Sequence, residues 1–175
     1  YLSEDPADVE KETHVMLPGV GAFGAAMDRL NETGLAQALR NRFAADHPTM
    51  AICVGLQVLC CESEESPDAT GLGVLEAKVR RFPNSVRVPQ LGWNLVKPAS
   101  PMNFVEEGFA YFANSYYIPE APDGWAAAYS DHGGRFVAAL ESGNCLALQF
   151  HPELSGAFGE AILKRWVNGK KGGRS

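Results

Sequence analysis

The sequence predicts an α/β fold with a mixed, mainly parallel sheet and helices on both faces. In the first half, strand-like runs alternate with helix-like stretches, the pattern of βαβ units. In the second half, short strand-like runs are separated by Pro, Gly and Asn, which indicates hairpins. The 175 residues are 46% hydrophobic and 21% charged, as in an ordinary globular domain. We therefore expect one domain over residues 1–175.

Strand–helix alternation is the feature of the first half. Residues 14–17 read as a short strand that stops at a Pro-Gly-Val-Gly turn, and residues 22–30 follow with apolar side chains at helical spacing. A second apolar helical face is predicted over residues 34–43. The expected elements that follow are a buried strand, a helix and an acidic loop, over residues 50–53, 55–61 and 62–70.

Six strands and one helix are expected in the second half. The strands are predicted over residues 74–82, 91–96, 109–117, 126–129, 136–140 and 145–150. Residues 155–168 place apolar side chains on one helical face, and a basic, glycine-rich tail follows from Gly169. No linker or internal repeat divides the sequence.

Charge and cysteine spacing exclude several kinds of partner. Lys and Arg total 15 against 21 Asp and Glu, a net charge of −6, whereas a nucleic-acid surface needs a basic excess. No apolar run approaches the roughly 18 residues of a membrane span, and the acidic start does not resemble a signal peptide. The four cysteines show no C-x-x-C spacing, so neither a zinc ribbon nor a disulfide framework fits. We expect a cytoplasmic protein with reduced thiols and with no metal, cofactor, nucleic-acid or membrane partner.

A candidate nucleophile, Cys53, lies where a predicted strand turns sharply into a helix. This arrangement is that of the nucleophile elbow of hydrolases, and Gly55 lets the helix pass close to the sheet. A helix N-terminus should lower the pKa of the thiol, and the thiolate is the form that attacks carbonyls. The alternative is a buried structural cysteine, which is the commoner case for a lone Cys.

A histidine and a carboxylate follow the last predicted strand, at His151 and Glu153. Period-2 spacing can place both on one face, and a cysteine nucleophile needs a base whose tautomer is held by a third group. Taken alone, His151 is more often a satisfied strand-end histidine, and His132 is a weaker alternative base. Together with the elbow, the pair predicts acyl-transfer chemistry.

Gly19, Val20 and Gly21 form a third candidate segment, directly after a predicted strand. Two glycines let backbone N–H groups turn toward a ligand, so the segment could form an oxyanion hole. The alternative is an ordinary glycine-rich turn between a strand and a helix.

Five motifs together resemble the class I glutamine amidotransferases, in the same order along the chain. They are L-P-G-V-G-A-F at 17–23, A-I-C-V-G-L-Q at 51–57, L-G-W-N at 91–94, Y-F-A-N-S-Y-Y at 111–117 and Q-F-H-P-E at 149–153. The resemblance implies that Cys53 attacks the side-chain amide of glutamine and that His151 and Glu153 complete the triad. A glutamyl thioester would then be hydrolysed and ammonia released.

Within that class, P-G-V-G-A-F and G-W-N resemble the glutaminase subunits of imidazole glycerol phosphate synthases, which act in histidine biosynthesis. The resemblance implies a heterodimer with a cyclase subunit that receives the ammonia. It implies that Gln57 and the backbone of Ser115 and Tyr116 hold the glutamine. It also implies that Gly19-Val20-Gly21 is a strand whose flip builds the oxyanion hole, with the Val54 N–H as second donor.

The sequence departs from the family pattern at several positions. Ala51 stands where the family usually has glycine, Asn114 where it has histidine and Leu154 where it has lysine. The sequence begins at Tyr1 without the family's first βα unit, so we expect a fragment or a processed product with an unpaired strand edge beside residues 14–17.

Two alternatives to the glutaminase remain open. One is a truncated module that docks on a synthase without hydrolysing glutamine, and the other is an amidotransferase for a different synthase. In the docked protein, Trp93, Tyr116 and Tyr117 are expected near the partner, with a core position as the alternative for Trp93.

Overall fold

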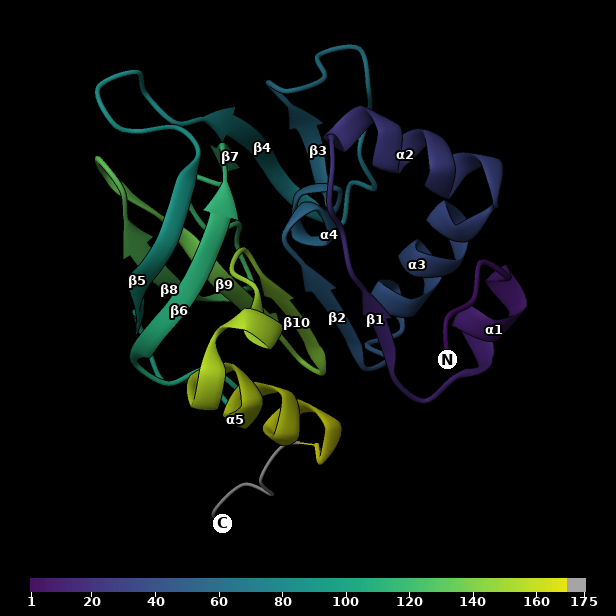
Figure 1. The fold of residues 1–175 in the computed structure, drawn as a ribbon. Coiled ribbons are helices and arrows are strands. Elements are labelled where there is room, and N and C mark those ends of the chain that lie inside the picture. The colour runs from purple at the N-terminus through teal and green to yellow at the C-terminus, as the bar shows by residue number, and fades with distance from the viewer. Residues whose placement is uncertain (170–175) are drawn as a thin grey trace.

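The computed structural model describes residues 1–169, and the α/β class is confirmed (Figure 1). The helices are α1 (Pro6–Lys11), α2 (Phe23–Glu32), α3 (Leu35–Ala44), α4 (Val54–Gln57) and α5 (Gly156–Val167), with a 3-10 turn η1 (Pro152–Leu154) before α5. The strands are β1 (Val15–Leu17), β2 (Thr49–Ile52), β3 (Cys60–Ser63), β4 (Leu75–Arg81), β5 (Gln90–Pro98), β6 (Gly108–Asn114), β7 (Tyr116–Tyr117), β8 (Ala126–Asp131), β9 (Arg135–Ser142) and β10 (Cys145–Leu148). Apart from Gly169, the predicted basic tail lies outside the described residues.

The main sheet is mixed, with the strand order β1-β2-β10-β9-β8-β5-β6. Only β1, β2 and β10 pair in parallel, and the other neighbours in this sheet are antiparallel. The expectation of a mainly parallel sheet is therefore wrong. The short connections of the second half join neighbouring strands as hairpins, and a hairpin pairs its strands antiparallel. The strands β3, β4 and β7 form a second, smaller sheet.

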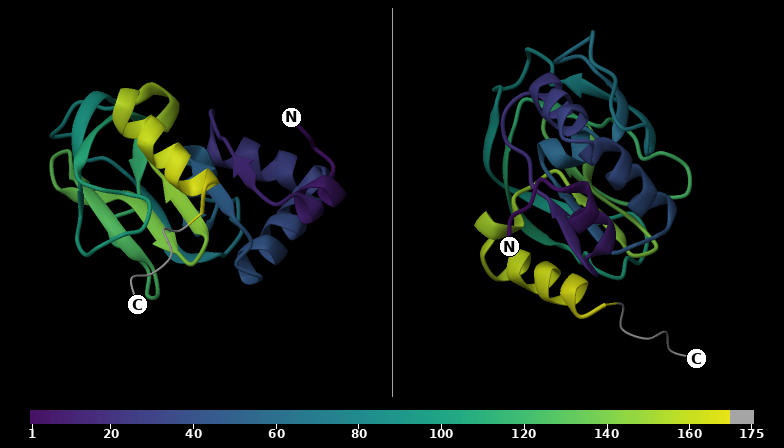
Figure 2. Two further views of the ribbon diagram at one scale, coloured as in Figure 1. Left: turned by 90° about the horizontal axis from the view of Figure 1, so that it is seen from below. Right: turned by 90° about the vertical axis from the view of Figure 1, so that its right-hand side faces the viewer.

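Helices pack on both sides of the parallel part of the main sheet, as expected. Strands β2 and β10 are buried along their whole length, in agreement with their continuous apolar sequences. Helices α3 and α5 lie on opposite sides of these strands (Figure 2). β1 stands at the end of the main sheet, where β2 is its only strand neighbour among the described residues.

The predicted helix over residues 55–61 is wrong in its second half, because α4 ends at Gln57 and the chain continues as β3. The residues after the acidic loop pair with this segment instead: the N–H of Leu72 donates to the Val58 carbonyl at 2.7 Å, and the N–H of Gly71 donates to the Cys61 carbonyl at 2.9 Å. A Cβ at Gly71 would overlap the Cys60 carbonyl. Tertiary pairing thus overrides the local helical pattern.

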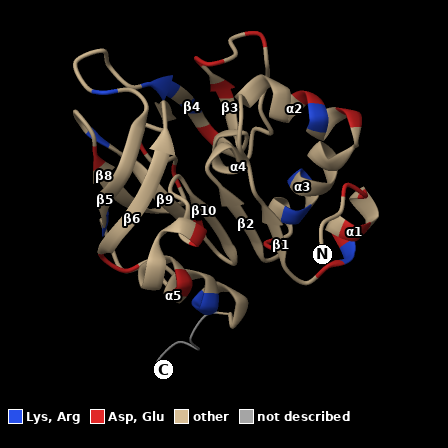
Figure 3. Ribbon diagram, in the orientation of Figure 1, with Lys and Arg blue, Asp and Glu red and all other residues tan. Residues whose placement is uncertain are grey.

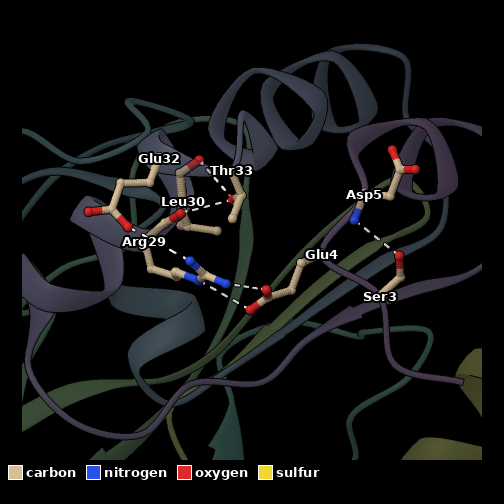
Figure 4. Close-up of polar contacts among 7 residues, drawn as sticks. All are labelled: Ser3, Glu4, Asp5, Arg29, Leu30, Glu32 and Thr33. Carbon is tan, nitrogen blue, oxygen red and sulfur yellow. Dashed lines mark hydrogen bonds and ion pairs between the residues drawn. The ribbon is translucent and has the colours of Figure 1, made fainter.

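The N-terminal segment contains a helix, α1, that the sequence pattern did not predict. Asp5 caps it by accepting the N–H of Ala7 at 2.9 Å, and Pro6 occupies its first turn. The buried guanidinium of Arg42 on α3 fastens the end of α1, because it donates to the carbonyls of Val9 and Glu12 at 2.7 Å each. Figure 4 shows a second anchor, in which Arg29 of α2 binds the Glu4 carboxylate.

Candidate active site

Cys53 stands at the turn between β2 and α4 with a backbone conformation rare for a residue with a side chain. Its φ is 55° and its ψ −111°. Such a conformation costs about 1–3 kcal/mol and persists only where the surroundings impose it. Here the N–H of Cys53 donates to the Leu148 carbonyl of β10 at 2.7 Å, and the Cys53 carbonyl accepts the N–H of Gln57. The predicted sharp turn from strand to helix is present.

The segment after β1 passes directly against this turn, and two glycines allow the approach. A Cβ at Gly19 would overlap the backbone nitrogen of Gly55, and a Cβ at Gly55 would overlap the Leu17 carbonyl. Gly21 has a φ of +97°, a value that L side chains rarely adopt. Gly19 of the candidate oxyanion segment, residues 19–21, therefore lies against Val54 and Gly55. Ala51 is fully buried opposite Leu17 and Ala147, so the sheet accommodates its methyl group.

His151 and Glu153 form a close pair, with His151 Nδ1 2.8 Å from Glu153 Oε1. The predicted reason for this pairing is wrong: β10 ends at Leu148, and the 3-10 turn η1 brings the two side chains together. The backbone of His151 is fixed by β6 and by Ser155. Its N–H donates to the Tyr111 carbonyl at 3.0 Å, and its carbonyl accepts the Ser155 hydroxyl at 2.6 Å.

Burial raises the pKa of the Cys53 thiol to about 11. The carboxylates of Glu153 and Glu65 contribute to this rise, whereas hydrogen bonds from the Val54 N–H and the Gln149 side chain partly oppose it. The N–H of Val54 at the start of α4 lowers this pKa, as expected, but burial outweighs it and the net shift is upward. Burial in the isolated chain therefore favours the neutral thiol of Cys53 over the thiolate.

A pocket of about 150 Å³ opens on Cys53. Its lining includes the predicted residues Gly21, Cys53, Val54, Gln57, Ser115 and Tyr116. His151, Glu153, Gly19 and Val20 line a neighbouring pocket of about 300 Å³. The predicted site residues thus gather around the carboxyl ends of β1, β2 and β10, divided between two pockets.

The sequence motifs did not identify three polar residues that lie close to Cys53. Glu65 and Asn114 line the pocket with Cys53, and Gln149 is fully buried with its amide nitrogen 3.8 Å from Cys53 Sγ. The only signal for Gln149 was its place in the Q-F-H-P-E motif. Glu65 lies in the acidic loop, where its carboxylate accepts the Phe23 N–H at the start of α2 at 2.7 Å.

The other candidate histidine lies apart from these residues. The ring of His132 stands edge-on against Phe82, and its Nε2 is 2.7 Å from the Arg87 carbonyl. Within residues 1–169, no group of three or more His, Cys, Asp or Glu side chains is placed to hold a metal ion. No helix in the same range is long and apolar enough to cross a membrane.

Comparison with known proteins shows one consistent family. The sequence profile described as "Glutamine amidotransferase class-I" matches residues 3–168. The "Imidazole glycerol phosphate synthase subunit HisH" of Symbiobacterium thermophilum is 40% identical over 173 residues, which cover 94% of this chain and 80% of that protein. The protein of the same name from Bacillus subtilis is 37% identical and covers 95% of this chain and 83% of its own.

Solved structures show the same fold at lower identity. A structure described as a glutamine amidotransferase superposes with a TM-score of 0.73 at 21% identity, covering 95% of this chain and 83% of its own. A glutamine amidotransferase from Thermotoga maritima gives a TM-score of 0.62 at 20% identity, covering 91% of this chain and 62% of its own.

Proposed function

Because this chain belongs to the class I glutamine amidotransferase family, we propose that it is the glutaminase subunit of an imidazole glycerol phosphate synthase. The similarity to subunits of that name, at 37–40% identity over most of both chains, supports this function. The reaction is hydrolysis of the glutamine side-chain amide to glutamate and ammonia, and the ammonia is passed to a cyclase subunit in histidine biosynthesis.

The observation that carries the proposed chemistry is that a histidine–glutamate pair and a cysteine elbow follow adjacent strands of one sheet. Cys53 and His151 follow β2 and β10, which are adjacent parallel strands, and the Cys53 N–H binds the Leu148 carbonyl at the end of β10. In the proposed mechanism His151 takes the thiol proton as the sulfur attacks the amide carbonyl. It then gives that proton to the departing ammonia. Water hydrolyses the thioester to glutamate and restores the thiol.

Glu153 is proposed to orient His151 and not to carry the proton. Its contact with Nδ1 makes that nitrogen the donor and leaves Nε2 to accept a proton from the thiol. The oxyanion formed during attack would be held by the Val54 N–H, just after the nucleophile, and by an N–H of residues 19–21.

The pocket residues supply the chemistry that glutamine requires. The Gln57 side-chain nitrogen donates both of its protons, to the Tyr116 carbonyl and to Gln149 Oε1. Its oxygen therefore remains available to accept a hydrogen bond from the substrate. The backbone of Ser115 and Tyr116 lines the same pocket and is proposed to hold the substrate with it. Glu65 is the acidic side chain of this pocket, so we propose that it faces the substrate's α-ammonium group.

An exposed apolar face is the proposed docking surface for the cyclase. It consists of Leu91, Trp93, Leu95, Phe109 and Leu154. Trp93 and Phe109 are 57% and 59% exposed, so the alternative of a core position for Trp93 is wrong. The strand stretches 90–96 and 108–114 that carry most of this face contain no charged residue, as Figure 3 shows for the ribbons of β5 and β6. Large aromatic side chains at the centre of such a face are typical of protein interfaces.

Tyr116 and Tyr117, also expected near the partner, are only partly exposed and pack against the core. The ring of Tyr117 stacks on Phe82 with 4.4 Å between centroids. Tyr116 thus forms part of the pocket wall and Tyr117 packs against the core, and Trp93 is the most exposed aromatic residue of the three.

The apolar face is connected to the histidine of the site by short contacts. Trp93 pairs with Tyr111 across β5 and β6, and Tyr111 is bound through its backbone to both His151 and Ser155. A partner that shifts Trp93 on docking would therefore shift the backbone of His151 through a single residue, Tyr111. This route supports the proposal that docking and hydrolysis are coupled.

The test is glutamate release, measured with and without the cyclase subunit of imidazole glycerol phosphate synthase and its nucleotide ligand. We expect hydrolysis that the cyclase stimulates and that Cys53→Ala abolishes while glutamine binding remains. Binding to the cyclase with no hydrolysis under any condition would favour the inactive docking module. Hydrolysis without binding to this cyclase would favour a different synthase.

A further inference from the structure

A line of side-chain amides runs through the protein interior and ends at the Cys53 thiol. Gln57 Nε2 donates to the Tyr116 carbonyl and to Gln149 Oε1, at 3.0 Å each. Gln149 Nε2 in turn lies 3.8 Å from Cys53 Sγ. Gln57 and Gln149 are 3% and 0% exposed, so water has little access to these hydrogen bonds.

The direction of these hydrogen bonds is fixed at one end by the backbone. The Tyr116 carbonyl can only accept, so the amide group of Gln57 must turn its nitrogen toward it. The second proton on that nitrogen then points at the oxygen of Gln149. Gln149 has no other orientation that satisfies this donor, and its own N–H group is left facing the sulfur.

We propose that Gln149 is a positioning residue for the nucleophile: oriented by Gln57, its amide N–H holds Cys53 Sγ in place and favours the thiolate over the thiol. The inference deepens the proposed function and rests on it. Gln149 itself touches neither substrate nor the transferred proton in this proposal. It acts through the sulfur of Cys53.

The electrostatic surroundings explain why such a donor is needed. Burial and the carboxylates of Glu153 and Glu65 raise the pKa of the Cys53 thiol, and no lysine or arginine of residues 1–169 lines its pocket. Against them stand the Val54 N–H and Gln149, which lower the pKa. If the Val54 N–H turns to the oxyanion during attack, Gln149 is the donor that stays with the sulfur.

The test is the ionisation of Cys53 in a variant that keeps the volume of Gln149 and removes its N–H. Thiolate ultraviolet absorbance would be titrated with pH in the wild type and in Gln149→Met, each after subtraction of the same protein carrying Cys53→Ala. We expect the midpoint of the Gln149→Met titration to rise by about one pH unit, a tenfold loss of thiolate. Gln90→Met, which removes another buried amide, on β5, should leave the midpoint unchanged.

Kinetics give a second readout that packing alone would not move. With the cyclase bound, Gln149→Met should lower kcat about tenfold at neutral pH with little change in KM. An unchanged midpoint in Gln149→Met, or an equal shift in Gln90→Met, would overturn the inference. If Gln149→Met does not fold, Gln57→Met replaces it. That variant frees the Gln149 amide to rotate, and it must raise the midpoint for the proposal to stand.

The titration needs no turnover, so it separates the two proposals. An unshifted midpoint in an active glutaminase would overturn only the role of Gln149. A shifted midpoint in a protein that never hydrolyses glutamine would overturn the proposed function and leave the hydrogen bond to Cys53 supported.

Discussion

His151 and Glu153 are paired at 2.8 Å across a boundary between interior and solvent: 10% of the histidine side chain is exposed, against 55% of the glutamate side chain. The carboxylate therefore keeps contact with water while it binds the ring. Such a carboxylate can hold the tautomer and direction of an imidazole without taking its proton. The 3-10 turn η1, and not a strand, brings the two side chains together, so the distance between them depends on the backbone conformation at Pro152.

The first prediction is that Glu153→Gln lowers turnover while the protein stays folded. An amide at this position can turn its N–H toward Nδ1 and favour the wrong tautomer, which costs between about 100-fold and 10,000-fold in kcat. The measurement is kcat for glutamate release with the cyclase present, alongside circular dichroism. Glu160→Gln, on the surface of α5, is the matched control and should retain full activity. Equal activity in Glu153→Gln would place the orienting group elsewhere.

The second prediction concerns stability at alkaline pH. The folded pKa of Cys53, about 11, lies above the ordinary 9.0, so folding favours the protonated thiol. This contribution is fully present below pH 9 and is lost as pH rises from 9 through 11, and two pKa units correspond to about 2–3 kcal/mol. Denaturant unfolding at pH 8 and pH 11 should therefore show a smaller loss of stability in Cys53→Ala than in the wild type. Parallel losses would mean that the thiol is not buried in solution.

The residues that the sequence pattern predicted well are those whose local chain determines their place. Cys53 and Gly55 belong to one sharp turn. The positive φ of Cys53 and the close approach of Gly55 to the Leu17 backbone both lie within these few residues. His151 and Glu153 are two residues apart, so any tight turn brings them together. The adjacent parallel strands β2 and β10 then place the turn at Cys53 and the His151–Glu153 pair at the same carboxyl edge of the sheet.

What the sequence did not predict depends on distant partners. Cys60 continues a helical pattern, yet it lies in a strand because residues 71–75 bind beside it. The pKa of Cys53 is set by burial under the whole fold, which no local motif reports. Gln149 acquires its neighbours from α4, 92 positions away in the sequence.

The third prediction separates two glycines of the candidate oxyanion segment. Gly19→Ala should disrupt the elbow, because its Cβ would overlap backbone atoms of Gly55 that cannot move aside. Gly21→Ala meets no atom within 4 Å but strains a φ of +97°, so it should cost about 1–2 kcal/mol of stability. Thermal unfolding should show the larger loss for Gly19→Ala. The opposite order would contradict the packing of this segment against α4.

The fourth prediction is that the isolated chain hydrolyses glutamine slowly. Resemblance to the family implies that residues 19–21 rest with an N–H turned away from the oxyanion. One missing oxyanion donor is worth about 100-fold to 1,000-fold in rate, so the cyclase and its ligand should stimulate hydrolysis by about that factor. Glutamate release with and without them decides the point. Full activity in the isolated chain would contradict the idea that the cyclase activates hydrolysis by turning residues 19–21.

The last prediction concerns the apolar face. Phe109→Ala should weaken cyclase binding by about 2 kcal/mol, roughly 30-fold in Kd, because exposed aromatic side chains become interface anchors when a partner covers them. Val167→Ala on α5 is the control, since Val167 is 56% exposed and lies outside this face. Basal hydrolysis should be the same in both variants, because neither side chain lines the pocket of Cys53. Titration calorimetry with the cyclase measures the two affinities. Equal affinities would move the docking surface away from β5 and β6.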